Sequence, residues 1–275
     1  MSIQSPLMAG KKGLIMGIAN ERSLAWGIAR AVADQGAELA VTWQGETLKK
    51  RVLPLAERLG AALTAEADVT DPASLDALFD AIAARWGRLD FLVHAIAWSD
   101  KEQLKGRYVD TTRENFQRSM LISCYSFTEL ARRALPLMED GGGSLLTLTY
   151  IGAERVVPHY NVMGVAKAAL EASVRYLAAD LGPAGIRVNA ISAGPVRTLA
   201  ASGIGDFRYI LKWNQLNSPL KRNTTIEDVG GAALFLLSEL GAGTTGEILH
   251  VDSGYHVVGM KAVDAPDIAA VQNNG

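Results

Sequence analysis

The sequence is poor in cysteine and lacks any long apolar run. Cys124 is the only cysteine among 275 residues, which excludes intrachain disulfides and indicates a reducing compartment. It lies in a stretch of helical pattern, where we expect a small buried thiol rather than a nucleophile. No run approaches the roughly 18 apolar residues of a membrane span, and residues 1–9 lack the basic start and apolar core of a secretory signal. We therefore expect a cytoplasmic protein that makes no contact with a membrane.

Charge of one sign is also scarce. The 27 basic and 29 acidic residues leave a net charge of −2, and no basic block occurs, so a nucleic-acid partner is not expected. The histidines are scattered without the spacing of metal ligands: His94, His159, His250 and His256. We expect no metal site.

The chain does contain a repeated alternation of two patterns. Seven short apolar runs have the character of buried strands: 13–16, 39–42, 63–67, 89–94, 145–149, 186–191 and 248–251. Segments of helical period lie between them, at 24–35, 47–59, 73–86, 113–138, 161–181 and 226–239. This alternation predicts an α/β fold of Rossmann type, a doubly wound sheet of about seven parallel strands with helices on both faces. No repeat or linker occurs, so residues 1–275 are expected to form one domain.

The ends of the helical segments carry recognisable signals. Asp71-Pro72 is a cap followed by a proline in the first turn, and Thr225 with Asp228 has the spacing of a capping box. Glycines stand where helices should stop: Gly36, Gly60, Gly87 and either Gly182 or Gly185.

Two segments break this rhythm. Residues 195–219 form a connection rich in Gly, Ala and Ser, and connections of that length usually act as lids or binding loops. The alternative is that the segment contains ordinary helices. Residues 261–275 have the composition of a weakly ordered C-terminal tail.

The first strand leads into a turn suited to a dinucleotide. Gly17 permits a sharp turn, and Gly27 permits close packing of the following helix on the sheet. The N–H groups at the start of that helix can hold a pyrophosphate, with Ser23 as cap and additional donor. The two glycines do not match the G-x-G-x-x-G pattern, so the prediction depends on their position after the first strand.

The next two strands end in residues that can contact an adenosine. Gln44 stands where dinucleotide folds usually carry an acid for the ribose or an arginine for a 2′-phosphate. Its amide can bind ribose hydroxyls, and no arginine lies beside it, so NADH is favoured over NADPH. Asp68 can accept the adenine amino group, although it can equally serve to turn the chain toward Asp71-Pro72.

Tyr160 and Lys167 are the strongest catalytic candidates. They are seven positions apart, which on a helix places both side chains on one face, about 10 Å apart along the axis. A phenol that donates a hydrogen bond and a fixed cation nearby are what polarisation of a carbonyl requires. The alternative is an ordinary surface pair on an amphipathic helix.

In residues 13–260, and most closely in 146–167 and 187–204, the chain resembles the enoyl-acyl-carrier-protein reductases of bacterial type II fatty-acid synthesis. That family is a divergent branch of the short-chain dehydrogenase/reductases. Ordinary members of the larger group use Tyr-x-x-x-Lys, which would require lysine at position 164. This chain has Gly164 there, with its lysine at position 167 and a second tyrosine, Tyr150, upstream.

The resemblance implies a role for each matching residue. Tyr160 would hydrogen-bond the thioester carbonyl, Lys167 would hold the nicotinamide ribose, and Tyr150 would be the second active-site tyrosine. The implied cofactor contacts are Gly17, Ser23, Leu24, Gln44, Asp68, Val69, Ile96, Lys167, Val196, Arg197, Thr198, Leu199 and Ala200. The implied substrate contacts are Ser99, Met163, Ile204 and Phe207, with 195–219 as the substrate-binding loop.

The implied reaction is reduction of a trans-2-enoyl thioester, carried on acyl carrier protein, with NADH as cofactor. The family also forms tetramers packed through the helices beside the active site, so a homotetramer is expected. The main alternative is another short-chain reductase acting on 3-oxoacyl thioesters or ketones, in which Thr147 or Thr149 replaces that group's usual serine. A protein that binds NAD(H) without turnover is a further alternative, but it would not need to retain both Tyr160 and Lys167.

Overall fold

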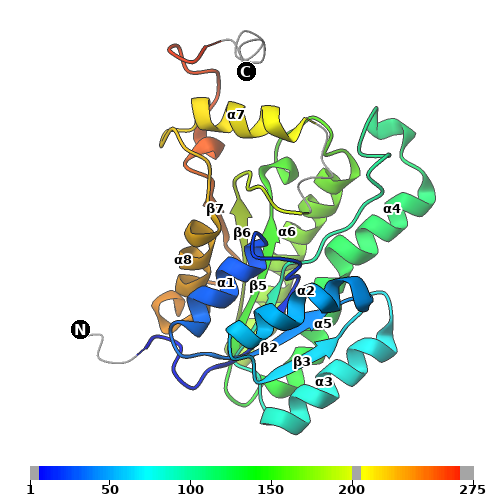
Figure 1. The fold of residues 1–275 in the computed structure, drawn as a ribbon, viewed down its shortest axis with the longest axis vertical. Helices are drawn as coiled ribbons and strands as arrows, with labels where there is room; N and C mark the ends of the chain where they lie inside the picture. The colour runs from blue at the N-terminus through cyan, green and yellow to red at the C-terminus, as the bar shows by residue number, and fades with distance from the viewer. Residues whose placement is uncertain (1–5, 200–205, 267–275) are drawn as a thin grey trace.

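The seven apolar runs form one parallel sheet. The computed structural model describes residues 6–199 and 206–266, and its strands follow the order β3-β2-β1-β4-β5-β6-β7 (Figure 1). All strand pairs are parallel, with Ile15 of β1 between Val41 of β2 and Val93 of β4. The strands are β1 Lys12–Met16, β2 Glu38–Trp43, β3 Leu63–Glu66, β4 Phe91–His94, β5 Gly143–Thr149, β6 Ile186–Ala193 and β7 Ile248–Val251. The predicted Rossmann-type sheet is confirmed.

Successive strand residues bury their side chains on opposite faces of this sheet, so two hydrophobic cores form. Leu14 and Leu145 belong to one core, whereas their neighbours Ile15 and Leu146 belong to the other. Helices α3 (Pro72–Trp86), α5 (Ser126–Ala134) and α6 (Val162–Leu181) cover the first face. Helices α1 (Leu24–Ala33), α2 (Gly45–Arg58) and α8 (Ile226–Leu237) cover the second face.

The predicted helix boundaries hold at the caps. Asp71 Oδ1 accepts the N–H of Ala73 at the start of α3, and Thr225 and Asp228 form a complete capping box at α8. Gly87 ends α3 in the left-handed conformation. After α6 this role falls to Gly185 rather than Gly182, because a short 3₁₀ turn over Gly182–Ala184 intervenes.

The segment predicted as one helix over 113–138 is not uniform. It consists of α4 (Arg113–Met120), a π-helical turn (Leu121–Tyr125), α5 and a 3₁₀ turn (Leu135–Leu137). The π turn buries Cys124, as expected for a core thiol, and burial raises the pKa of that thiol. The hydrophobic period of the sequence does not reveal such a turn, because apolar residues continue through it.

The connection between β6 and α8 is only partly a loop. Its second half forms helix α7 (Phe207–Asn217), which lies across the carboxyl ends of the strands (Figure 1). The prediction of a loop over 195–219 was therefore wrong for this half, and the alternative of an ordinary helix holds there. Residues 200–205 lie outside the described part of the chain.

The start of the predicted C-terminal tail is packed against this region. Ala262 N–H donates to Asn217 Oδ1 at 2.9 Å, and the side chain of Ala265 is buried. Residues 261–266 are thus more ordered than their composition suggested, whereas 267–275 lie outside the described residues. Within the described part, no helix is both long and apolar enough to cross a membrane.

A buried polar group joins three elements below the carboxyl ends of the strands. His94 at the end of β4 contacts Thr147 Oγ1 of β5 at 2.8 Å and Ser126 Oγ of α5 at 2.9 Å. Burial, followed by the charge of Lys167, lowers the pKa of His94 to about 3. The imidazole is therefore neutral at physiological pH and acts as a fixed hydrogen-bonding link.

Gly27 does not serve the contact that the sequence predicted. A Cβ at this position would lie 2.4 Å from the carbonyl oxygen of Ile226, and one at Gly230 would lie 2.7 Å from the carbonyl oxygen of Gly27. The two glycines therefore bring α1 and α8 together, and the missing side chain does not face the sheet. A pattern in one segment cannot show which other segment packs on it.

This contact gives a test of the packing. We expect Gly27→Ala to lower the free energy of unfolding by about 1–3 kcal/mol, because the added methyl meets backbone that cannot move aside. Gly231→Ala on α8 is the matched control, since a Cβ there meets nothing within 4 Å, and it should stabilise by about 0.5–1 kcal/mol. Urea unfolding of both variants measures the difference. Equal free energies of unfolding in the two variants would contradict the close approach of α1 and α8.

Candidate active site

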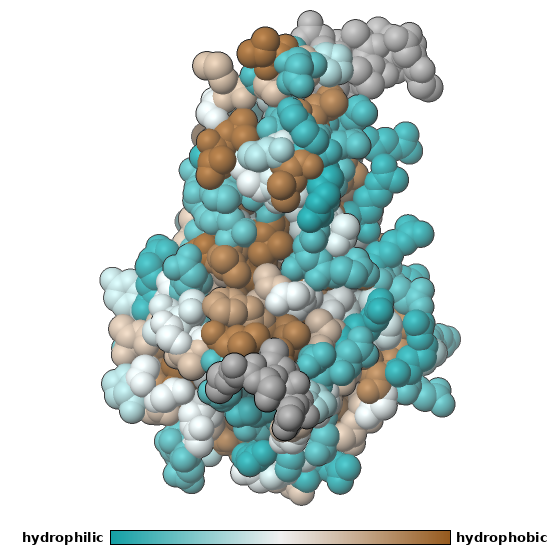
Figure 2. Space-filling view, turned by 90° about the vertical axis from the view of Figure 1, so that its left-hand side faces the viewer, coloured by the Kyte–Doolittle hydropathy of each residue, from teal (hydrophilic) through white to brown (hydrophobic). Residues whose placement is uncertain are grey.

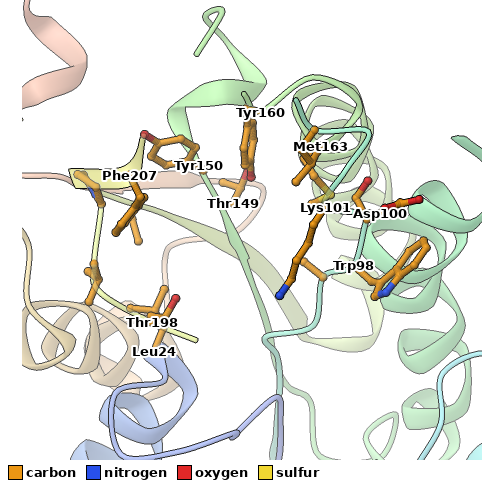
Figure 3. Close-up of a pocket in the computed structure, with 17 residues that line it drawn as sticks. Leu24, Trp98, Asp100, Lys101, Thr149, Tyr150, Tyr160, Met163, Thr198 and Phe207 are labelled. Atoms are coloured by element: carbon orange, nitrogen blue, oxygen red, sulfur yellow. The ribbon is translucent and has the colours of Figure 1, made fainter. Parts of the chain in front are cut away.

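A cavity of about 530 Å³ opens at the carboxyl ends of β4, β5 and β6 (Figure 3). Ligands of open α/β sheets bind at this edge, because the connecting segments diverge there. The lining is mostly apolar and comes from segments far apart in the sequence. It consists of Leu24, Ala97, Trp98, Ser99, Asp100, Lys101, Leu104, Thr149, Tyr150, Tyr160, Met163, Ala193, Gly194, Pro195, Val196, Thr198 and Phe207.

Two tyrosines form one wall of the cavity. The rings of Tyr150 and Tyr160 meet edge to face, with centroids 5.1 Å apart and an angle of 73° between their planes. Burial is the main cause that raises the pKa of both phenols, and neighbouring acidic groups add to it. Both hydroxyls therefore keep their protons at neutral pH and can donate a hydrogen bond into the cavity.

Tyr160 lies in a turn just before α6, although its spacing to Lys167 was interpreted as helical. Helix α6 begins at Val162, and Asn161 before it has a φ of 38°. The Asn161 side chain donates to the carbonyl groups of Gln103, Leu104 and Gly106. This ties the segment after β4 to the start of α6 and closes one side of the cavity. Helical spacing therefore does not set the relation of Tyr160 to Lys167.

Lys167 lies on α6, directly behind the cavity lining. Its Nζ donates to the carbonyl oxygen of Leu148 at 2.7 Å, and only 6% of the residue is exposed. Burial is the main cause that lowers its pKa, to about 8. The pattern of a surface pair is thus excluded, because Tyr160 and Lys167 are both buried beside the end of β5.

The two threonines near the end of β5 have different surroundings. Thr147 is completely buried in the contact with His94, whereas Thr149 lines the cavity. Thr149 Oγ1 donates to Glu171 Oε1 of α6 at 2.6 Å. Glu171 is itself buried, and burial is the main cause that raises its pKa.

The turn after β1 has the predicted shape, with one difference. Gly17 has a φ of +106°, and a Cβ there would lie 2.1 Å from the carbonyl oxygen of Ala95, so only glycine fits. Ser23 stands at the N-cap position of α1, but its hydroxyl makes no cap hydrogen bond to the helix. It accepts instead from the N–H groups of Ala19 and Asn20, and so fixes the turn that precedes the helix.

Gln44 and Asp68 lie together at the ends of β2 and β3. Gln44 Nε2 donates to Asp68 Oδ2 at 2.8 Å, and Asp68 Oδ1 accepts from Thr70. Burial opposes ionisation of Asp68, but the hydrogen bonds from Thr70 and Gln44 outweigh it and lower the pKa. Both readings of Asp68 are thus compatible, because one oxygen turns the chain while the other faces Gln44.

The remaining predicted site residues divide into groups. The ones that line the main cavity are Leu24, Ser99, Tyr150, Tyr160, Met163, Val196, Thr198 and Phe207. Arg197 and Leu199 line a neighbouring hollow together with Asn20 and Arg22. Val69 and Ile96 belong to the hydrophobic core beside the strand ends. Ala200 and Ile204 lie outside the described residues.

Sequence reasoning missed several residues of the site. Lys101 and Leu104 line the cavity, and Figure 3 shows Lys101 extending along it. Glu66 accepts the N–H of Gly45 beside Gln44. Lys101 and Leu104 follow the predicted end of β4, and Glu66 lies at that of β3. These positions could have been identified from the sequence, because residues at the ends of parallel strands gather at one edge of the sheet. Among the described residues, no group of three or more His, Cys, Asp or Glu could hold a metal ion.

The fold and the cavity together define a Rossmann-type protein with a buried tyrosine and lysine at its binding edge, the general arrangement of short-chain reductases. The family profile described as "Enoyl-(Acyl carrier protein) reductase" matches residues 17–256. Enoyl-[acyl-carrier-protein] reductase [NADH] 1 of Rhizobium meliloti is 67% identical over 273 residues, which cover 99% of this chain and 100% of the relative. The corresponding FabI protein of Rickettsia felis is 60% identical, over 92% of this chain and 97% of the relative.

Solved structures agree with these relatives. The Anaplasma phagocytophilum reductase, crystallised in complex with NAD, matches with a TM-score of 0.91 at 67% identity, over 96% of this chain and 98% of that chain. The NADH reductase of Aquifex aeolicus matches with a TM-score of 0.90 at 49% identity, over 92% and 99%. The chain belongs to the enoyl-(acyl carrier protein) reductase family.

Proposed function

We propose that this protein reduces the trans-2 double bond of enoyl thioesters carried on acyl carrier protein, with NADH as cofactor. The observation that carries the proposal is the buried, protonated hydroxyl of Tyr160 in the wall of a mostly apolar cavity. The cavity has room for an acyl chain, and the family membership and the NADH-named relatives support the same reaction.

The chain's residues fit a dinucleotide along the strand ends. The turn at Gly17 and the N-terminus of α1 suit a pyrophosphate, and the pair of Gln44 and Asp68 suits an adenosine. The Lys167 amine can donate a second hydrogen bond to a ribose hydroxyl while it keeps its hydrogen bond to the Leu148 carbonyl oxygen. When bound, NADH supplies the hydride that the substrate accepts at C3.

The remaining catalytic work falls to the protein. As C3 is reduced, negative charge develops on the thioester oxygen. Tyr160 donates a hydrogen bond to that oxygen, and the Lys167 cation adds positive potential from behind the end of β5. Such donors are effective because they are already oriented in a mostly apolar cavity. Tyr150 packs edge to face on Tyr160 and holds its ring in place.

Carboxylates near Gln44 favour NADH over NADPH. Glu66 accepts from Gly45 N–H at 3.0 Å, and Glu46 lies at the first turn of α2. Together with Asp68, they outnumber the nearby cations Lys49 and Arg118, so a 2′-phosphate would meet net like charge. Ribose hydroxyls, by contrast, can donate to these carboxylates.

The rival reductase of 3-oxoacyl thioesters is not favoured by the structure. An ordinary short-chain enzyme would need lysine at position 164, but a Cβ on Gly164 would lie 2.7 Å from the carbonyl oxygen of Gly152. Thr147 cannot serve as the catalytic serine equivalent, because it is buried outside the cavity. Of these two threonines, Thr149 is the one that lines the cavity.

We further propose that the protein is a cytoplasmic homotetramer built from single-domain copies, with the segment 195–219, including α7, contributing to the substrate site. Helices α4 to α6 expose hydrophobic side chains at Phe116, Leu121, Tyr125, Val165 and Tyr176. Figure 2 shows hydrophobic residues (brown) gathered on the side where α8 and the edge strand β7 lie. Two such surfaces are what a tetramer with paired two-fold axes requires. Sedimentation velocity tests this, and a monomer would contradict it.

Turnover with two substrates tests the function and the role of Tyr160. We expect NADH oxidation with a trans-2-enoyl thioester and none with a 3-oxoacyl thioester of the same length. Tyr160→Phe should lower kcat on the order of 10²–10³ fold with a much smaller change in KM, because the lost donor acts on charge that develops during reaction. Steady-state kinetics measures both.

The controls are direct. Tyr108→Phe, at an exposed tyrosine that does not line the cavity, should leave kcat unchanged. Faster turnover of the 3-oxoacyl substrate would favour the rival reductase, and an unchanged kcat in Tyr160→Phe would remove that residue from the proposed role.

The lowered pKa of Lys167 gives a pH dependence for cofactor binding. Below a pH of about 8 the amine is charged, and above it the cation is lost. NADH affinity should therefore be constant at low pH and fall as the pH rises through about 8, by about ten- to hundredfold, the size of one hydrogen bond to a charged group. Calorimetric titrations across this range measure it. Lys167→Met should bind weakly without this step, and a step of the same size in that variant would assign it to another group.

A further inference from the structure

The protein must also supply a proton to its substrate, and Tyr160 and Lys167 leave the source of that proton open. If the proposed function holds, hydride addition at C3 leaves an electron pair shared by C2 and the thioester oxygen. A proton must then form the C2–H bond. Tyr160 has a pKa far above neutral and is suited to holding a hydrogen bond rather than to losing its proton.

A buried carboxyl group touches the lining of the cavity at one point. Thr149 lines the cavity (Figure 3), and its hydroxyl donates to Glu171 Oε1 at 2.6 Å. Glu171 follows Lys167 by one turn on α6, and 7% of it is exposed. A carboxylate this buried is costly unless it is paired and hydrogen-bonded or becomes protonated, and this hydroxyl is the hydrogen-bond partner that the described structure gives it.

Glu171 also lies within electrostatic reach of groups that lead outward. These are Glu154, after β5, and His250, on β7. They contact each other through His250 Nε2 and Glu154 Oε1 at 2.8 Å, and Glu154 is partly exposed to solvent. The His250 ring stacks on that of His256, whose Nδ1 contacts Asp252. The other charged or titratable groups that act on Glu171 or respond to it are Arg175, Lys167 and Tyr160.

We propose that Glu171 and Thr149 form a proton relay that leads from the surface pair His250–Glu154 to the floor of the active-site cavity. The relay starts with Glu171 protonated, so that the hydrogen bond to Thr149 is reversed: the carboxyl O–H donates to Thr149 Oγ1, and the Thr149 hydroxyl turns toward the cavity. The Glu171 O–H bond then breaks as a new O–H bond forms on Thr149 Oγ1. The original hydroxyl proton of Thr149 passes to a water molecule in the cavity, and a proton of that water forms the C2–H bond. The carboxylate then takes a proton from solvent through water beside His250 and Glu154. No redox partner beyond NADH is required.

Thr149 lines the cavity directly, whereas Glu171 acts on the cavity through Thr149. A structural reading is the natural competitor, because Glu171 also raises the pKa of Lys167 and could serve only to keep that amine charged. The two readings differ in what they affect. A counter-ion affects cofactor binding, while a relay affects the step in which a proton moves.

The test compares Glu171→Gln and Thr149→Val with the wild type. Glu171→Gln keeps the shape and an oxygen acceptor but carries no transferable acid proton. Thr149→Val keeps the shape without the hydroxyl. We expect each to lower kcat by at least about tenfold, since general acid catalysis typically contributes 10²–10⁴ fold. The solvent isotope effect on kcat in D₂O should become larger than in the wild type, while the NADH dissociation constant, measured by fluorescence without substrate, stays within about threefold.

Two further variants make the result specific. Thr149→Ser restores a hydroxyl and should recover turnover relative to Thr149→Val. This pair of variants tests the relay even if Glu171→Gln does not fold. Asp180→Asn removes an exposed carboxylate from the same helix and should behave as the wild type. In Glu171→Ala, added formate should raise kcat, whereas chloride at equal concentration should not.

The outcomes separate the relay from the function. Wild-type kcat and isotope effect in both Glu171→Gln and Thr149→Val would overturn the relay and leave the proposed reaction intact. Lower kcat with an unchanged isotope effect and much weaker NADH binding would also overturn it, in favour of the counter-ion role. A wild-type protein that does not oxidise NADH with an enoyl thioester would refute the proposed function and the relay with it.

Discussion

The active site depends on the contact between helix α6 and the end of strand β5. Lys167 Nζ donates to the carbonyl oxygen of Leu148, and Thr149, the next residue, donates to Glu171 one turn further along the helix. These two hydrogen bonds join backbone and side chains at the floor of the cavity. They bury an amine and a carboxyl group that would otherwise be hydrated, and they fix where the cavity meets the helix. Tyr160 enters the same cavity from the turn just before α6.

Burial determines what each of these groups can do. It keeps the phenols of Tyr150 and Tyr160 protonated and lowers the pKa of Lys167 to about 8. In a mostly apolar cavity, oriented donors and a nearby cation stabilise developing negative charge more strongly than they would in solvent. The same low polarity suits an acyl chain. One physical property of the cavity thus supports both the binding of an apolar substrate and the stabilisation of an anionic oxygen.

The sequence predicts the sheet well and the contacts between segments poorly. All seven strands were predicted and confirmed, because a strand buried on both faces is a short apolar run whatever its neighbours are. Gly27, Ser23 and α7 were misjudged, each for a different reason. The partner of Gly27 is a helix about 200 residues away in the chain, Ser23 bonds the turn before it instead of its own helix, and α7 is masked by a Gly- and Ala-rich approach. Tyr160 and Lys167 both lie buried beside the end of β5, but helical spacing does not connect them, since α6 begins only at Val162, after Asn161.

The most direct test of the account is a crystal structure with NAD⁺ and an enoyl thioester bound. We expect Tyr160 Oη to lie within hydrogen-bond distance of the thioester oxygen, and Lys167 Nζ to contact the nicotinamide ribose while it remains close to Leu148. The acyl chain should occupy the cavity bounded by Met163 and Phe207. A complex in which the Tyr160 ring points away from the thioester, or in which the substrate binds outside this cavity, would contradict it.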